Sequence, residues 1–144
     1  THLYEAYLFN RDREFLQKAY PLIKRAAQFA QDWLIEDKRK DALKDPLGRP
    51  YLLTAPSVSP EVGFVGPDGK GHSTGIGATM DLDITRWILT AAIDSADVLG
   101  LDKDLRDRFA ETRERILPWQ VGERGNLQEW ADTSLTYWLP TPAT

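Results

Sequence analysis

The sequence predicts a mainly α-helical domain in which antiparallel helix pairs carry a long ordered loop and a small β-hairpin. Apolar residues recur at three- and four-residue spacing on both sides of residues 45–78, the pattern of helices that bury one face. Residues 45–78 interrupt this pattern, because seven of the ten glycines and five of the nine prolines lie there. With 144 residues, 42% of them hydrophobic, the chain is long enough for one domain with a buried core.

Three helices are predicted before this loop. The first spans about residues 2–9, and Asp12 is a suitable N-cap for a second helix over residues 12–19. Pro21 cannot donate a backbone hydrogen bond but fits the first turn of a helix, so a third helix is predicted over residues 20–36.

Two helices and a hairpin are predicted after the loop. A long apolar stripe over residues 79–99 predicts a core-facing helix that Gly100 would cap, and a further helix is expected over residues 103–117. The run WQVGERGNLQEW contains the turn GERG between two β-like segments, so residues 119–130 are predicted to form a small hairpin. Within the loop, YLLT (51–54) is predicted to be a short strand, and the remainder to be an ordered loop that carries function.

Composition excludes several classes of protein. The net charge is −4 and acidic and basic residues alternate, so no basic face for nucleic acid is expected. No apolar run approaches the roughly 20 residues of a membrane span, and the N-terminus lacks the features of a signal peptide. Without cysteine, neither disulfides nor thiolate catalysis is possible. His2 and His72 lie far apart, so neither a metal site nor a cofactor is expected, and the cellular compartment stays open.

The stretch TAPSVSPEVGF (54–64) holds one carboxylate, Glu61, between prolines and glycines. In one interpretation Ser59, Pro60 and Glu61 open a helix, as cap, first residue and dipole-complementing acid. The glycines and proline that follow argue against a continuing helix. In the other interpretation a rigid loop keeps the acid among apolar neighbours, and partial shielding from water favours the protonated form that a general acid needs.

Two further groups of residues allow both a structural and a sugar-binding interpretation. Asp81 lies at the start of a predicted helix, where the helix dipole alone would favour it, but it could also bind sugar hydroxyls. Gln128, Glu129 and Trp130 combine an amide, a carboxylate and an indole, which either pack at the edge of the hairpin or bind a sugar. By contrast, GPDGKG (66–71) lacks any phosphate-binding pattern and is predicted to be a turn.

Three motifs in order, LTAPSVSPEVGF, GATMDLDI and VGERGNLQEW, resemble those of the inverting α-L-fucosidases of glycoside hydrolase family 95. The resemblance covers residues 1 to about 131. It implies a catalytic domain built as an (α/α)6 toroid, of which this chain would be about the middle third. It also implies that Glu61, at the SPE position, is the general acid that acts on terminal α-L-fucose, or on L-galactose, of a glycan. Family members in bacteria are commonly exported.

The resemblance also shows what this chain lacks. The family positions its attacking water with asparagines of an upstream motif and an aspartate of a downstream one, and neither motif occurs here. The family's Arg-His pair beyond QEW is missing too, and Val62 replaces the asparagine that usually follows the SPE glutamate. We therefore expect the isolated chain to be a catalytically inert fragment. Its uncovered apolar faces should bind the rest of the catalytic domain or lead to self-association.

Two non-enzymatic interpretations remain open at this stage. The chain could be a helical carbohydrate-binding or scaffold module, in which Trp130 and Asp81 would matter more than Glu61. It could also be a structural helical domain without sugar affinity, although the motifs preserved in the loops argue against this.

Overall fold

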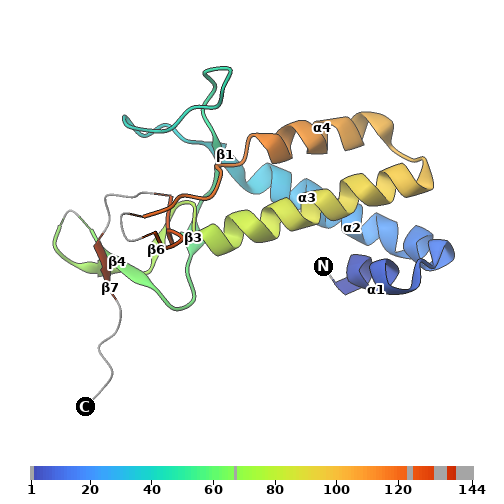
Figure 1. The fold of residues 1–144 in the computed structure, drawn as a ribbon, viewed down its shortest axis with the longest axis horizontal. Coiled ribbons are helices and arrows are strands. Elements are labelled where there is room, and N and C mark those ends of the chain that lie inside the picture. The colour runs from blue at the N-terminus through green and yellow to red at the C-terminus, as the bar shows by residue number, and fades with distance from the viewer. Residues whose placement is uncertain (1, 67, 123–124, 132–135, 139–144) are drawn as a thin grey trace, which may run out of the picture.

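The structure, a computed structural model, describes residues 2–66, 68–122, 125–131 and 136–138. These residues form four helices and seven short strands, so the chain is mainly α, as predicted (Figure 1). The strands and long loops gather at one end of the helices, where α2 ends and α3 begins (Figure 1).

The first two helices are α1 (His2–Asn10) and α2 (Arg13–Trp33). Asp12 caps α2 as predicted, since its carboxylate accepts a 3.0 Å hydrogen bond from the backbone N–H of Phe15. The predicted break between residues 19 and 20 is wrong, because α2 continues through Pro21. The proline ring lies on the exposed side, while one buried stripe runs along both halves of the helix: Leu16, Ala19, Tyr20, Ile23, Ala27 and Ala30. Packing of this stripe outweighs the one backbone hydrogen bond that proline removes.

The other two helices are α3 (Thr79–Leu99) and α4 (Lys103–Glu114). Gly100 caps α3 in the left-handed conformation (φ 71°), as predicted, and its N–H bonds to the carbonyl of Ala96. The short connection makes α3 and α4 antiparallel (Figure 1). Helix α4 ends three residues before the predicted position 117, because the backbone after it pairs with Leu52 instead.

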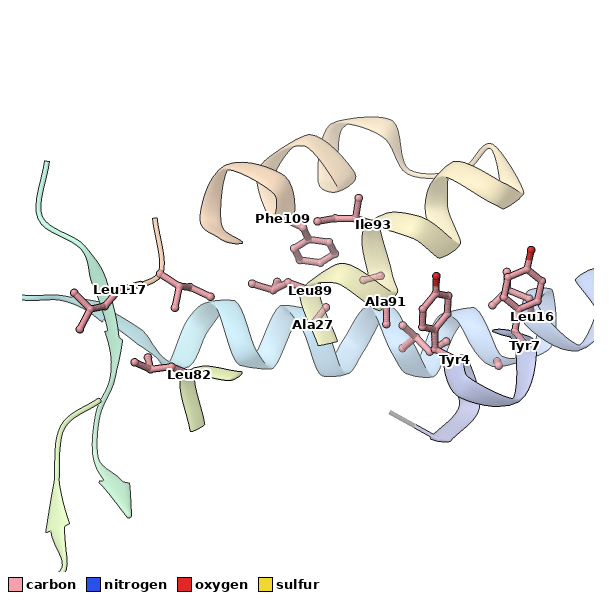
Figure 2. Close-up of a cluster of buried hydrophobic side chains, with 14 of the residues drawn as sticks. Tyr4, Tyr7, Leu16, Ala27, Leu82, Leu89, Ala91, Ile93, Phe109 and Leu117 are labelled. Atoms are coloured by element: carbon pink, nitrogen blue, oxygen red, sulfur yellow. The ribbon is translucent and has the colours of Figure 1, made fainter. Parts of the chain in front are cut away.

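The main core lies between α2, α3 and α4, with α1 packed at one end (Figure 2). Small residues of α3 allow close approach of the neighbouring helices, and larger side chains fill the remaining space. Its most buried members are Leu16, Ala27, Leu53, Leu89, Ala91, Ala92, Phe109 and Ile116.

The predicted strand YLLT is observed as β2 (Leu52–Thr54), which pairs antiparallel with β1 (Leu34–Glu36). Strand β1 replaces the last turn of the predicted helix 20–36, because its backbone finds a partner in β2. Loop residues 57–75 also pair, so the long loop is a set of short hairpins. Two small antiparallel sheets result: β3 (Ser57–Val58) with β6 (Thr74–Gly75), and β4 (Gly63–Val65) between β5 (Gly71–His72) and β7 (Thr136–Trp138).

The predicted hairpin at 119–130 is observed in reduced form. Val121 pairs with Leu127 in an isolated antiparallel bridge, and the N–H of Gln128 bonds to the carbonyl of Gln120. Residues 123 and 124 of its turn lie outside the described residues. The hairpin carries Gln128, Glu129 and Trp130 to the start of α3, where Ala78 bridges Trp130.

Several large apolar side chains of the helices face outward. Leu22 and Phe29 on α2 are 63% and 69% exposed, and Met80 and Ile84 on α3 are also exposed. Part of the apolar stripe predicted to face the core therefore has no cover among the described residues. What covers these faces, another part of a catalytic domain or a second copy, stays a prediction. None of the described helices is long and apolar enough to cross a membrane.

A buried carboxylate, Asp37, joins the end of β1 to the hairpin. Arg39 binds it through Nε and Nη2, at 2.9 and 2.7 Å, and the same guanidinium donates to the carbonyl of Ala131. Burial alone would raise the pKa of Asp37, but the hydrogen bonds and charge of Arg39 outweigh it and hold the pKa below its usual value.

Asp37→Asn is therefore expected to lower the free energy of unfolding by about 1–3 kcal/mol at pH 7, because hydrogen bonds to a charged partner are lost. A lowered folded-state pKa means that the stabilisation is present at neutral pH and is lost as pH falls below about 4. Urea unfolding at pH 7 and pH 3 measures this. Asp41→Asn, an exposed acid of the same loop, is the control. Equal effects of the two variants at pH 7 would contradict the role of Asp37.

Candidate active site

The candidate site is built around residues 57–62, here called the Glu61 loop. Three side-chain hydrogen bonds tie this loop to the two other motifs. Ser57 Oγ donates to Asp81 Oδ2 at 2.7 Å, and Ser59 Oγ donates to Glu129 Oε1. Trp130 Nε1 donates to the carbonyl of Val62 at 3.2 Å. The three motifs, 20 to 70 residues apart in sequence, thus meet at one place.

Ser57 fixes the start of the loop. Its buried hydroxyl accepts from Thr54 Oγ1 at 3.1 Å and from the backbone N–H of Ala78 at 2.9 Å. The Ser57 hydroxyl donates its own hydrogen bond to the carboxylate of Asp81, which also accepts a hydrogen bond from the N–H of Val58. In this structure Asp81 therefore holds the loop against the start of α3. Contact of Asp81 with a substrate stays a prediction.

Ser59 shows that the loop does not open a helix. Its Oγ accepts from the N–H of Val62, as in a helix cap, but strand β4 begins at Gly63. The helix-opening interpretation of Ser59, Pro60 and Glu61 is therefore wrong. The residues form a tight turn instead, and Glu129 anchors this turn from the hairpin side.

Trp130 is the apolar anchor of the site. It is 1% exposed and packs edge-on against Phe64, with ring centroids 5.1 Å apart. A Cβ added at Gly75 would lie 3.2 Å from the indole, so the ring is enclosed on that side as well. In this structure the indole supports the Glu61 loop and offers no open face, and direct stacking on a sugar stays a prediction.

Gln128 lies where the hairpin meets the first turn of α3. It is 7% exposed, and its backbone carbonyl accepts from Thr79 Oγ1 at 2.6 Å. The N–H of Thr79 bonds to the carbonyl of Glu129, so the hairpin and the first turn of α3 are joined by main-chain bonds. As with Asp81, contact of Gln128 and Glu129 with a substrate stays a prediction.

Glu61 itself lines a cavity of about 660 Å³ together with Ser59, Val62 and residues of β4 and β5. The carboxylate is exposed, and it forms no hydrogen bond or ion pair with any residue that the structure describes. The expected shielding of Glu61 by its apolar neighbours is therefore wrong for this chain. Val58 turns outward and Phe64 turns toward Trp130, so neither covers the acid.

A second hollow, of about 600 Å³, lies along residues 35–39. Both acids there are already paired: Glu36 with Arg115 at 2.9 Å, and Asp37 with Arg39. Asp37 is a poor proton donor, because Arg39 favours its ionised form, and Glu36 is tied to Arg115. Within the described residues, no group of three or more histidine, aspartate or glutamate side chains could hold a metal ion. The Glu61 cavity is therefore the better candidate for acid chemistry.

Comparison with known proteins identifies the family of the chain. The model of the glycosyl hydrolase family 95 catalytic domain matches residues 1–136. The chain belongs to this family. The family 95 match extends beyond the residue 131 at which the sequence resemblance was expected to end, and it includes the first residue of β7.

A curated relative, alpha-L-fucosidase 2 of Arabidopsis thaliana, is 34% identical to this family 95 chain over 134 residues. The alignment covers 92% of the chain but 15% of that relative. The chain therefore spans about a seventh of the length of the enzyme that it resembles.

Sequence reasoning missed the bond from Ser57 to Asp81, and it considered Ser59 only as a helix cap, not as a partner of Glu129. It also missed the contacts of His72, which were considered only for metal binding. Asp81 lies 24 residues from Ser57, and Glu129 lies 70 residues from Ser59. No spacing rule connects residues so far apart, and only the shared family motifs indicated that these segments belong together.

Proposed function

We propose that this chain is the acid-bearing part of a family 95 glycoside hydrolase that removes terminal α-L-fucose, or L-galactose, from glycans with inversion. The observation that carries the proposal is that all three motifs converge on the Glu61 loop and leave Glu61 as the unpaired carboxylate in the cavity. The Arabidopsis relative bears the name of an α-L-fucosidase, which supports fucose as the sugar released.

In the proposed reaction Glu61 donates its proton to the glycosidic oxygen as the bond from that oxygen to C1 of fucose breaks. A water attacks C1 from the opposite face, and its proton passes to a base that this chain does not contain. In an inverting enzyme the acid and the base are roughly 6.5–9.5 Å apart, which leaves room for the water. The chain lacks the water-positioning asparagines and aspartate, so that half of the site would lie in other parts of the catalytic domain.

The exposed faces of α2 and α3 support the same proposal. In a complete (α/α)6 toroid, neighbouring helix pairs would cover the apolar side chains of Leu22, Phe29 and Ile84. The antiparallel order of α2, α3 and α4 fits such a ring (Figure 1).

The proposed function is tested in a complete catalytic domain that carries these residues, incubated with an α-L-fucoside. Proton NMR should detect β-L-fucose as the first product, because inversion converts the α anomer into the β anomer. Release of the α anomer, or no release, would contradict the proposal. The 144-residue chain assayed alone should show no turnover, since it has the proton donor without the water-positioning groups. Turnover by the chain alone that Glu61→Gln abolishes would show the expected inertness to be wrong.

A further inference from the structure

The hairpin of β4 and β5 brings a histidine into the cavity of Glu61. Its turn is closed by hydrogen bonds from the N–H of Gly66 to the carbonyl of Lys70, and from the N–H of Gly69 to the carbonyl of Gly66. His72, on β5, is the register partner of Phe64 on β4. The same cavity of about 660 Å³ is lined by Glu61 and His72.

Several contacts hold the imidazole in one orientation. His72 Nε2 lies 2.9 Å from Asp68 Oδ1, and the ring stacks on Phe64 with centroids 5.6 Å apart and an interplanar angle of 27°. A Cβ added at Gly66 would lie 2.8 Å from Cδ2 of His72, so the ring occupies space that only glycine leaves open. Phe64 in turn packs on Trp130, which connects the histidine to the anchor of the Glu61 loop.

The hydrogen-bonding roles of the ring follow from its partner. The hydrogen bond from His72 and the N–H of Lys70 hold the pKa of Asp68 below its usual value, so this carboxylate is ionised at neutral pH and can only accept. Nε2 of His72 therefore carries the hydrogen, and Nδ1 of the neutral ring is an acceptor. Nδ1 has no hydrogen bond to any residue that the structure describes, and the side chain is 41% exposed.

The side of the cavity that His72 occupies indicates which part of a substrate it would meet. In an inverting glycosidase the water attacks the face of the sugar opposite the acid, so the water-positioning groups lie beyond the fucose. The acid side of the cavity is formed by the Glu61 loop and the β4–β5 hairpin. The sugar to which fucose was attached leaves along this side. His72 belongs to this side, since it lines the cavity together with Glu61.

We propose that His72, held by Asp68, binds the leaving-group side of the substrate by accepting a hydrogen bond from a hydroxyl of the sugar to which fucose is attached. This inference rests on the proposed function, because a leaving-group side exists only if Glu61 is the acid of a site that cleaves fucosides. The simpler alternative is that Asp68 and His72 form an exposed pair that only stabilises the hairpin, and does so weakly.

Binding is tested on the 144-residue chain by NMR of the imidazole nitrogens, with lactose and L-fucose as separate probes. The chain has two histidines, and His2, which lies in α1 and does not line the Glu61 cavity, is the internal reference. We expect lactose to shift the His72 nitrogens and to leave those of His2 unchanged, and L-fucose alone to have no effect on either. Absence of a lactose shift at His72, or an equal shift with L-fucose, would overturn the inference.

Two variants of the turn separate sugar binding from hairpin stability. Gly66→Ala should displace the imidazole and abolish the lactose shift. Lys70→Ala is the control, because the Lys70 side chain is exposed, does not line the cavity, and bonds within the described part of the turn only through its backbone. Persistence of the lactose shift in Gly66→Ala, or its loss in both variants, would count against His72 as the binding residue.

Kinetics in a complete catalytic domain distinguish this inference from the proposed function. His72→Ala should lower kcat/KM about fivefold to tenfold for a fucosyl disaccharide, the size of one lost hydrogen bond, through a raised KM. It should leave 4-nitrophenyl α-L-fucoside unchanged, because that leaving group has no sugar hydroxyl. Equal losses on both substrates, or no loss on either, would overturn the role of His72 while leaving the function of Glu61 intact. A lactose shift at His72 in a protein that hydrolyses no fucoside would contradict the proposed function alone.

Discussion

Replacing Glu61 by glutamine is expected to lower kcat of the complete catalytic domain on a fucosyl disaccharide by about 10²–10⁴, the usual contribution of a general acid. Glutamine has nearly the same shape as glutamate but cannot transfer a proton to the glycosidic oxygen. The loss should be much smaller on 2,4-dinitrophenyl α-L-fucoside, because dinitrophenolate leaves without protonation.

The contrast between the two substrates is the measurement that assigns the role. A variant that merely distorted the site would lose activity on both substrates to the same extent. Glu14→Gln is the control, since Glu14 is an exposed acid in the first turn of α2, at the other end of the helices (Figure 1). Equal losses on both substrates for Glu61→Gln, or a loss of less than about tenfold on the disaccharide, would place the acid elsewhere.

The helices could be predicted from sequence where their signals are local. Asp12 and Gly100 act within one turn of a helix, so each fixed a boundary correctly. The signal from Pro21 is local too, yet the helix break predicted there is wrong. Buried side chains before and after Pro21 pack on the same neighbours and keep α2 continuous. Strand β1 was missed for a related reason, since its pairing with β2 depends on a partner 18 residues away.

It could be predicted from sequence that the three motif segments lie together, but not which contacts join them. The family motifs placed Glu61, Asp81 and Trp130 in one site, and the structure brings their segments together. Residue types alone could not show that Asp81 and Glu129 bind serines of the loop. Nor could they show that Glu61 is exposed in this chain, because shielding depends on which way Val58 and Phe64 turn. The direction of Phe64 is set by Trp130, a residue 66 positions beyond it.

Trp130→Ala is expected to lower the free energy of unfolding by about 3–5 kcal/mol, the range for removal of a buried aromatic side chain from a core. The indole is 1% exposed, packs on Phe64 and holds the carbonyl of Val62, so its loss leaves a cavity beneath the Glu61 loop. Urea unfolding measures the change. Trp119→Ala is the matched control, because Trp119 is 65% exposed and its indole makes one hydrogen bond, to Asp83. We expect that variant to lose about 1 kcal/mol or less.

A domain with a total stability of about 5–15 kcal/mol could unfold when it loses this much, so a milder variant is needed. Trp130→Phe keeps an aromatic ring against Phe64 but removes part of the buried apolar volume and the Nε1 hydrogen bond to Val62, of which the bond alone should cost about 1 kcal/mol. In that variant the amide hydrogens of the Glu61 loop should exchange faster while those of α3 keep their protection, because the indole is one of two side-chain links between the loop and the hairpin, beside the bond from Ser59 to Glu129. Unchanged exchange in the loop, or Trp130→Ala and Trp119→Ala of equal stability, would mean that Trp130 does not position Glu61. The convergence of the three motifs would then have to serve the fold alone.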